Sequence, residues 1–416
     1  MGGGSPGADE SLTSHEGVTP IPTRGIWDVN RGLDMNGLLR QRDGREARVG
    51  FVELFFDLVF VFAVTQVSHF LLENLTWLGA LQAAMMVTAV WWAWVYTSWV
   101  TNWLDPQRAA VQIGLFVLMA AGLVMSAALP HAFEDAGLAF GAAFAFIQVG
   151  RTLFMLLACR EDTSLRRNFQ RILVWLSISA VLWIGGGLAA PEQRLWWWLG
   201  ALAIEYVGPV AYFWTPGLGR STTQDWNVEG AHMAERVGLF TIICLGETLL
   251  ISGATFARLE WTLPVIAAFG SAIASTIAMW WLYFSRAHES AAHTIAHAED
   301  PGALARKGYT YSPLLVVAGI IVVAVSDELV LAHPLGHIEP TMALTLLGGP
   351  ALFLLGTSVA TLAIWGRMAW ARLAGCAVLA AGWLLVPLTT PVMLSLLSTG
   401  VLLVVAAWET LRAPRS

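Results

Sequence analysis

Apolar stretches of about 20 residues recur along almost the whole chain, separated by short polar segments. A helix of about 20 apolar residues is long enough to cross the ~30 Å hydrocarbon core of a bilayer. The pattern therefore predicts an all-α integral membrane protein with about twelve transmembrane helices. It leaves open whether the last of these is a separate span. The predicted spans are residues 51–73, 76–100, 108–130, 136–159, 169–190, 195–214, 236–257, 262–285, 309–332, 340–364, 369–388 and 391–410.

The composition indicates a protein that resides in lipid. Of the 416 residues, 56% are apolar and 12% are charged, and the mean hydropathy is +0.63. Soluble domains carry about 25% charged residues. Cys159, Cys244 and Cys376 lie inside apolar stretches, without the spacing of a disulfide framework or a zinc site. The sequence contains no phosphate-binding or metalloprotease motif, so we expect no cofactor, and the lipid bilayer is the predicted partner.

The basic residues indicate how the spans are oriented. With a cytoplasmic N-terminus, 20 of the 23 Lys and Arg residues fall in cytoplasmic segments, Arg151 lies within a span, and only Arg194 and Arg258 fall in outer loops. Cytoplasmic loops carry an excess of basic residues, so both termini are predicted to be cytoplasmic. These residues are spread over many loops, and nucleic-acid binding is therefore not expected. The tryptophans at 91–103 are expected to anchor the second span at the membrane surface.

The chain is predicted to consist of two related halves. The sequence RVGFVELFFDLVF at residues 48–60 recurs loosely as RVGLFTIICLGETLL at 236–250. Six spans per half are an even number, so the halves share one orientation and form a parallel 6+6 repeat. The expected units are a polar, disordered cytoplasmic tail (1–48), a first half (49–214), a cytoplasmic loop with a charged motif (215–235) and a second half (236–416).

Four acidic residues lie inside predicted spans. Glu53 and Asp57 are four residues apart on one helix face, while Glu205 and Glu247 lie deep in two later spans. A charged residue at the centre of an inserting helix costs about 2.5–3.5 kcal/mol, so such residues usually face a bundle interior or a watery cavity. The four acids are therefore candidates for binding an ion or substrate, as alternatives to structural hydrogen bonds.

Arg151 is the one basic residue at comparable depth. A lone buried guanidinium needs a carboxylate, and Asp57 or Glu53 are predicted partners because they lie at a similar depth. This pair would be structural. In the alternative interpretations, Arg151 binds an anion or tunes the buried acids.

The densest polar motif is STTQDWNVEGAHMAERVGLF at residues 221–240. On a helix, its acidic residues and its histidine share one face, which indicates an inner-side gate of paired charges or a proton relay. Glu-x-x-His can ligate metal in di-iron bundles, but those contain two copies plus two further glutamates. Only one copy is present, so no metal site is predicted. The gate candidates are Asp225, which we expect to cap a helix, with Glu229, His232, Glu235 and Arg236.

The motifs VELFFDLVFVFAVTQVSHFL, TNWLDP, GLGRSTTQDWNVEGAHMAERVGLFTIICLGETLLISGATF and WWLYF resemble the bacterial low temperature requirement protein A family over residues 48–410. The resemblance implies a multi-pass protein of the bacterial inner membrane that is associated with growth in the cold. It implies no reaction, substrate or catalytic residue. The family pattern marks Glu53, Asp57, Asp105, Arg151, Asp225, Glu229, His232, Glu235, Arg236 and Glu247 as its signature positions.

These observations favour a proton- or cation-linked transporter of an unknown small molecule. In this interpretation Asp57, Glu205 and Glu247 bind the ion, and Arg151 tunes them. One alternative is a passive cation channel. Another is a membrane enzyme that acts on a lipid or lipid-linked substrate, with His232 and a neighbouring glutamate as an acid–base pair. The absence of known catalytic motifs makes an enzyme the less favoured of these.

Overall fold

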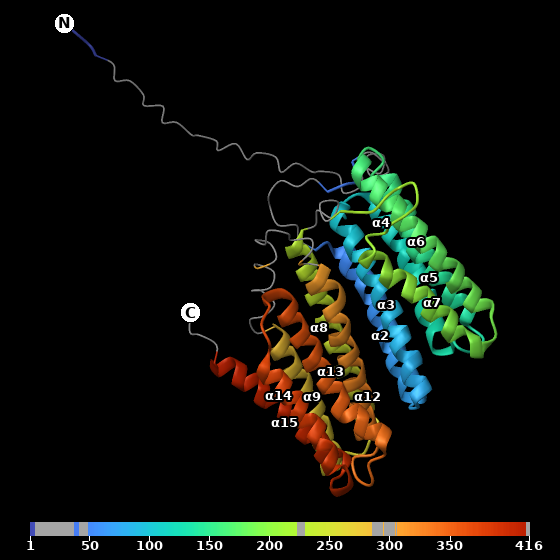
Figure 1. The fold of residues 1–416 in the computed structure, drawn as a ribbon. Coiled ribbons are helices and arrows are strands. Elements are labelled where there is room, and N and C mark those ends of the chain that lie inside the picture. The colour runs from blue at the N-terminus through green and yellow to red at the C-terminus, as the bar shows by residue number, and fades with distance from the viewer. Residues whose placement is uncertain are drawn as a thin grey trace.

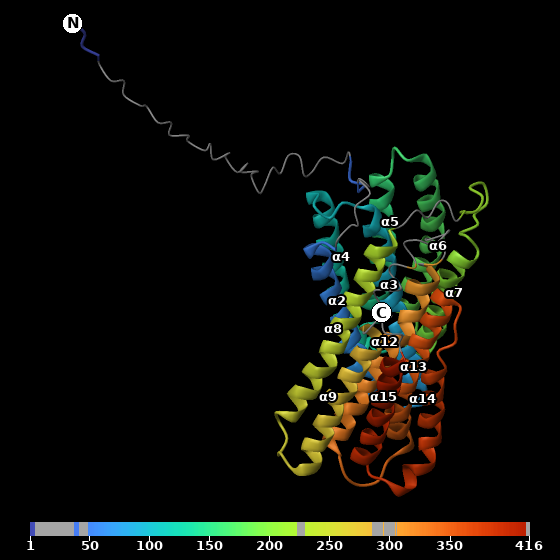
Figure 2. The same cartoon turned by 90° about the vertical axis from the view of Figure 1, so that its left-hand side faces the viewer.

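The computed structural model describes residues 1–4, 37–40, 49–222, 229–284, 294, 304 and 306–412. Within these ranges the long elements are twelve α-helices that run roughly side by side along one axis (Figures 1 and 2). They are α2 (Phe51–Glu73), α3 (Trp77–Trp103), α4 (Ala109–Ala128), α5 (Gly137–Ala158), α6 (Thr163–Leu188), α7 (Pro191–Val210), α8 (Gly230–Phe256), α9 (Leu263–Phe284), α12 (Ser312–Ala332), α13 (Pro340–Trp365), α14 (Trp370–Ala381) and α15 (Pro391–Arg412).

Each predicted span coincides with one of these helices, so the all-α prediction is confirmed. Eleven helical segments of the described chain are long and apolar enough to cross a membrane. The exception is α7, whose first turns carry Glu192, Arg194 and a run of tryptophans. The end of the chain forms two separate segments, because α14 continues as a short 3₁₀ helix to Leu388 and α15 begins at Pro391.

Local sequence signals determine where several helices begin and end. The side chain of Thr76 accepts a hydrogen bond from the Gly79 amide at 3.0 Å, and that of Asp162 accepts one from the Leu165 amide at 2.9 Å. Both are N-cap bonds, which satisfy amides that have no partner in the first helical turn. Helix α13 ends at Gly366, whose φ of 63° is the left-handed conformation that glycine adopts without strain.

The helices form two groups, α2–α7 and α8–α15, which lie beside each other in Figure 1. Helix α2 packs on α3 and α4, and α8 packs in the same way on α9 and α12. The two groups meet where α2 and α3 contact α8 and α12. The first helix of each group therefore lies at the boundary between the groups.

Small residues allow α12 and α13 to approach closely. A Cβ atom added at Gly319 would lie 2.6 Å from the Phe353 amide nitrogen, and one at Gly356 would lie 2.7 Å from that of Val316. Close packing of small residues is a main source of helix association in lipid, because the hydrophobic effect does not act between helices there.

We predict that α7 crosses the membrane despite its polar first turn. In a protein whose native cysteines are replaced by alanine, cysteines introduced at the exposed positions Glu192 and Arg220 flank this helix. A membrane-impermeant maleimide should label them from opposite sides of the membrane, with Arg220→Cys accessible only from the cytoplasmic side. Labelling of both from one side would contradict a twelve-span topology.

Candidate functional site

Four ionisable side chains form a buried cluster between the beginnings of α2 and α8. Glu53 and Asp57 are one turn apart on α2, and His232 and Arg236 are one turn apart on α8. All four residues have 0% exposed surface. Residues four apart lie on the same face of a helix, so α2 presents two acids to two basic residues on α8. Two sets of residues that the sequence suggested separately, the intramembrane acids and the gate, thus belong to one site.

The Arg236 guanidinium bridges both carboxylates. Its Nε donates to Asp57 Oδ2 at 3.2 Å, and its Nη2 donates to Asp57 Oδ1. Its Nη1 donates to Glu53 Oε1 at 3.1 Å and to Thr101 Oγ1 at 2.9 Å. Trp94 Nε1 donates to Asp57 Oδ1 at 2.7 Å. The two-point pairing with Asp57 requires the planar fork of an arginine, which a lysine ammonium does not provide.

Asn102 on α3 fastens the first turn of α8. Its Oδ1 accepts from the Glu229 amide at 2.9 Å, and its Nδ2 donates to the Glu229 carbonyl at 3.0 Å. Asn102 Nδ2 also lies 3.3 Å from His232 Nδ1, and His232 Nε2 lies 3.2 Å from Glu53 Oε1. With Nδ1 accepting, a neutral imidazole carries its hydrogen on Nε2 and donates to Glu53. Both ring nitrogens are therefore engaged.

Arg40 and the Gly50 amide, both before α2 in the chain, contact the Glu53 side of the cluster. The Gly50 amide donates to Glu53 Oε2 at 2.8 Å, and Arg40 Nη2 lies 3.8 Å from the same oxygen. The Val49 amide donates to Glu235 Oε2 at 3.2 Å in an exposed position. Glu235 therefore lies at the rim of the site, whereas Glu53 lies inside it.

The helix that carries His232 and Arg236 begins earlier than predicted. Helix α8 starts at Gly230, six residues before the predicted span, and Glu229 occupies its N-cap position without a side-chain cap bond. Its first two turns therefore belong to the packed bundle and not to a loop. Asp225, the predicted cap, lies outside the described residues.

The predicted pairing of Arg151 with Asp57 or Glu53 is wrong. Arg151 is 2% exposed, and its Nη1 donates to the Ala93 carbonyl and to Thr97 Oγ1, each at 3.2 Å. Its guanidinium carbon lies 5.2 Å from the centre of the Tyr96 ring. Across the described ranges, no carboxylate oxygen lies within ion-pair distance of Arg151, and its Nε and Nη2 have no hydrogen-bond partner. Arg236 takes the position that the sequence suggested for Arg151.

Glu205 lies in a separate polar site inside the first helix group. Its carboxylate accepts hydrogen bonds from Ser179 Oγ, from Trp183 Nε1 at 2.9 Å and from Gln148 Nε2. The residue is 2% exposed. Three donors on one carboxylate satisfy it without a base, so this acid is held by the neutral side chains of α5 and α6.

Glu247 is the least constrained of the predicted acids. It is only partly buried, and the described chain offers it no hydrogen bond or ion pair, although it lies well inside α8. Asp327 on α12 is a further acid inside a helix that is apolar enough to cross the membrane. It is 5% exposed, and its Oδ2 has no partner among the described residues. Both carboxylates are free to take up a proton without breaking a bond.

The tryptophans at 91–103 in α3 are packed inside the protein and do not anchor it at the membrane surface. Trp91, Trp92 and Trp94 are 0–1% exposed, and Trp99 and Trp103 are below 10%. Trp94 shows why the anchoring interpretation failed, because its indole nitrogen bonds to Asp57 inside the cluster. Sequence reasoning also missed Thr101 and Asn102, although they lie in the motif before the first cytoplasmic loop.

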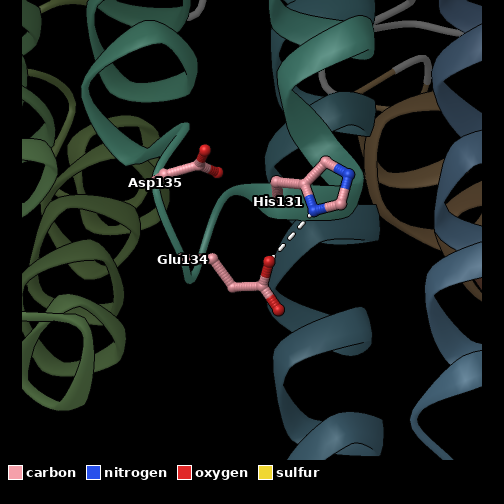
Figure 3. Close-up of side chains that lie close together, drawn as sticks. All are labelled: His131, Glu134 and Asp135. Carbon is pink, nitrogen blue, oxygen red and sulfur yellow. Dashed lines mark hydrogen bonds and ion pairs between the residues drawn. The ribbon is translucent and has the colours of Figure 1, made fainter.

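An exposed acidic group lies at the other end of the first helix group, in the turn before α5. His131, Glu134 and Asp135 offer ligand atoms within 4.8 Å of one another, and His131 Nδ1 lies 3.0 Å from Glu134 Oε2 (Figure 3). Figure 3 shows the Glu134 carboxylate directed toward the imidazole, as in an ordinary pair at i and i+3. Solvent reaches all three side chains, so this arrangement is consistent with a surface turn.

We expect Arg236→Gln to destabilise the protein strongly, because it leaves Glu53 and Asp57 buried without their base. Loss of one partner of a buried ion pair costs about 3–5 kcal/mol. Thermal unfolding of the purified protein in detergent measures the effect, with the exposed Arg167→Gln as control. Neutralising all three residues in Arg236→Met/Glu53→Gln/Asp57→Asn should recover part of the loss. An Arg236→Gln protein with the same unfolding temperature as the control would contradict the stabilising role of the ion pairs with Glu53 and Asp57.

We expect Glu205→Gln and Glu247→Gln to differ in stability. The first change places an amide NH₂ among three donors and costs about 1–3 kcal/mol, the penalty for buried groups that lose a partner. The second breaks no bond of the described chain and should leave the unfolding midpoint within error of wild type. Equal destabilisation by the two substitutions would show that Glu247 has a buried partner.

Comparison with known proteins places the chain in a family. It is 40% identical over 374 residues to an "uncharacterized protein" of Rhizobium meliloti (strain 1021), covering 89% of this chain and 91% of that protein. No solved structure matches the chain. The family model described as "Bacterial low temperature requirement A protein" matches residues 48–407, which include all twelve helices except the last turn of α15. The chain is therefore a polytopic membrane protein with buried carboxylates that belongs to the bacterial low temperature requirement A family.

Proposed function

We propose that the protein is a proton-linked transporter of the bacterial cytoplasmic membrane, in which the cluster around Arg236 closes the cytoplasmic side. The observation that carries the proposal is the position of this cluster between the first helices of the two helix groups. Transporters built from two repeats change access by moving one repeat against the other around a central site. A bond network across that boundary holds the two groups together at one end.

The orientation and the repeat belong to the same proposal. The excess of basic residues supports an orientation with the end that holds the cluster, and both termini, in the cytoplasm. The matching contacts of α2 with α3 and α4, and of α8 with α9 and α12, support a parallel 6+6 repeat. The cluster then lies at the cytoplasmic end of the boundary between the repeats, where a gate is required.

The chemistry of the cluster favours a proton over a metal cation as the coupling ion. A cation placed between Glu53 and Asp57 would meet the Arg236 guanidinium, which already occupies that space. A proton needs no such space. Protonation of Asp57 and Glu53 removes the charge that holds Arg236, so the ion pairs weaken and α8 is released from α2. His232 Nε2 donates to Glu53, so the same protonation also weakens the contact of this histidine with α2.

Glu205 and Glu247 extend the proposed proton pathway away from the gate. Glu205 is held by three donors and stays in place during a transport cycle. Glu247 breaks no bond when it changes protonation, and it lies on the same helix as His232 and Arg236. We therefore assign Glu247 as the acid whose proton binding accompanies movement of α8.

The alternative of a lipid-modifying enzyme is not favoured by the geometry of His232. Its imidazole is fully buried, and both ring nitrogens are bonded to side chains of the cluster. A general acid–base residue must come within hydrogen-bond reach of a substrate. His232 is enclosed by α2, α3 and α8 and reaches only protein groups.

We expect wild-type protein in liposomes containing a pH-sensitive dye to move protons when a suitable solute is supplied under an imposed potential. Sodium, potassium and pools of organic solutes are screened in turn. Glu247→Gln and Asp57→Asn should abolish this movement, because each removes a proton-binding carboxylate. The exposed Glu161→Gln serves as a matched control and should transport normally. Gel filtration of each variant establishes that it is folded.

The other outcomes separate the alternatives. Normal transport by both Glu247→Gln and Asp57→Asn would contradict the proposed role of the acids. Current carried by one cation without any solute or proton movement would identify a passive channel instead. Vesicles that remain tight to protons with every solute would overturn proton-linked transport.

A further inference from the structure

A cavity lies between α3, α4 and α5, and Arg151 forms part of its wall. Its volume is about 280 Å³, and its wall is largely apolar. The polar groups in the wall are Arg151, Thr97 and Thr101. Drug-sized ligands occupy sites of about 300–1,000 Å³, so this space suits a smaller ligand or one end of a longer one.

The guanidinium of Arg151 is fixed on one edge and free on the other. Nη1 donates to Ala93 and Thr97, which anchors the group on α3. Nε and Nη2 are buried without partners. These two nitrogens form the side-on edge of the guanidinium, whose parallel N–H groups match the two oxygens of a carboxylate. A buried donor pair without an acceptor is costly, and a bound anion removes that cost.

The protein itself provides no anion for this edge within the described ranges. The Glu205 carboxylate lies in the same helix group as Arg151, but its oxygens already accept from Ser179, Trp183 and Gln148. No ion pair joins it to Arg151. The remaining wall of the cavity consists of apolar residues of α3, α4 and α5 and of Leu104 after α3.

The cavity opens toward the lipid. Ile113 and Val117 on α4 and Phe146 on α5 line it, and each is also 48–50% exposed on the outer surface of a membrane-spanning helix. A ligand can therefore enter between α4 and α5 from the bilayer, with an apolar chain following its charged end. A water-soluble anion without such a chain would have to cross an apolar wall.

We propose that this cavity binds a single-chain carboxylate from the bilayer, a ligand of the fatty-acid class, with its carboxylate on Arg151 and its chain between α4 and α5. One guanidinium balances the single charge of a carboxylate. A phosphate monoester carries a charge of about −1.5 to −2 and would leave charge uncompensated, because no second basic side chain lines the described cavity. The apolar wall accepts the chain.

Binding of radiolabelled laurate to purified protein in a non-ionic detergent tests the proposal. Wild type should bind laurate in a saturable manner, and dodecanol, which lacks the charge, should not compete. Arg151→Met keeps the length of the side chain and should weaken binding at least tenfold. Gly114→Leu fills the cavity from α4 without touching Arg151, since a Cβ there makes only ordinary contact with Phe154 at 3.5 Å. It should weaken binding to a similar extent.

The control is Arg167→Met, which removes an exposed arginine of α6 and should bind laurate like wild type. Unfolding midpoints measured on every variant separate lost binding from lost structure. Laurate binding that survives both Arg151→Met and Gly114→Leu would overturn the proposal. Competition by chloride or acetate at the concentration of laurate would show that the chain is not recognised. Tighter binding of dodecyl phosphate than of laurate would contradict the assignment of a carboxylate ligand and indicate a phosphate lipid instead.

Discussion

One buried guanidinium shared by two carboxylates is the interaction on which this bundle depends. Arg236 comes from the second helix group, and Glu53 and Asp57 come from the first. None of the three is stable alone in a low-dielectric interior, where an unpaired charge costs several kcal/mol. The hydrogen bonds of Trp94, Thr101 and Asn102 hold the partners in register from α3. The contact between the groups is therefore specified by charge as well as by apolar packing, which in lipid has little direction of its own.

The two helix groups differ in how they satisfy polar side chains. The first encloses Glu205 and Arg151, each held by neutral groups of neighbouring helices. The second relies on hydroxyl contacts, such as Ser271 with Ser395 at 2.8 Å, and on the Arg372–Glu409 pair near its edge. The two groups thus have similar contacts around α2 and α8 but differ in the polar side chains that they bury.

The helices could be predicted from the sequence because a 20-residue apolar stretch has one stable form in lipid. The partners of the buried charges could not. Asp57 and Arg151 lie at similar depth, and depth alone suggested that they pair. Depth carries no information on which helix faces are adjacent, and α8 with Arg236 proved to be the neighbour of α2. The charged motif was also assigned to a loop, because charge ended the apolar stretch at 236 while the helix itself begins at Gly230. Burial of Trp94 was not predicted, because tryptophan usually lies at the membrane–water interface.

The shared guanidinium also affects the biosynthesis of the protein. Asp57 and Arg236 are 179 residues apart in the chain, and ribosomes add about 5–20 residues per second. The acids of α2 therefore leave the ribosome roughly 10–40 s before their base. During this interval the five helices α3–α7 are synthesised while the charges of α2 have no final partner. The first half must hold α2 at the membrane surface, or with its acids protonated, until α8 arrives. The order of synthesis thus delays the pairing of α2 with α8 until the helices between them have been made.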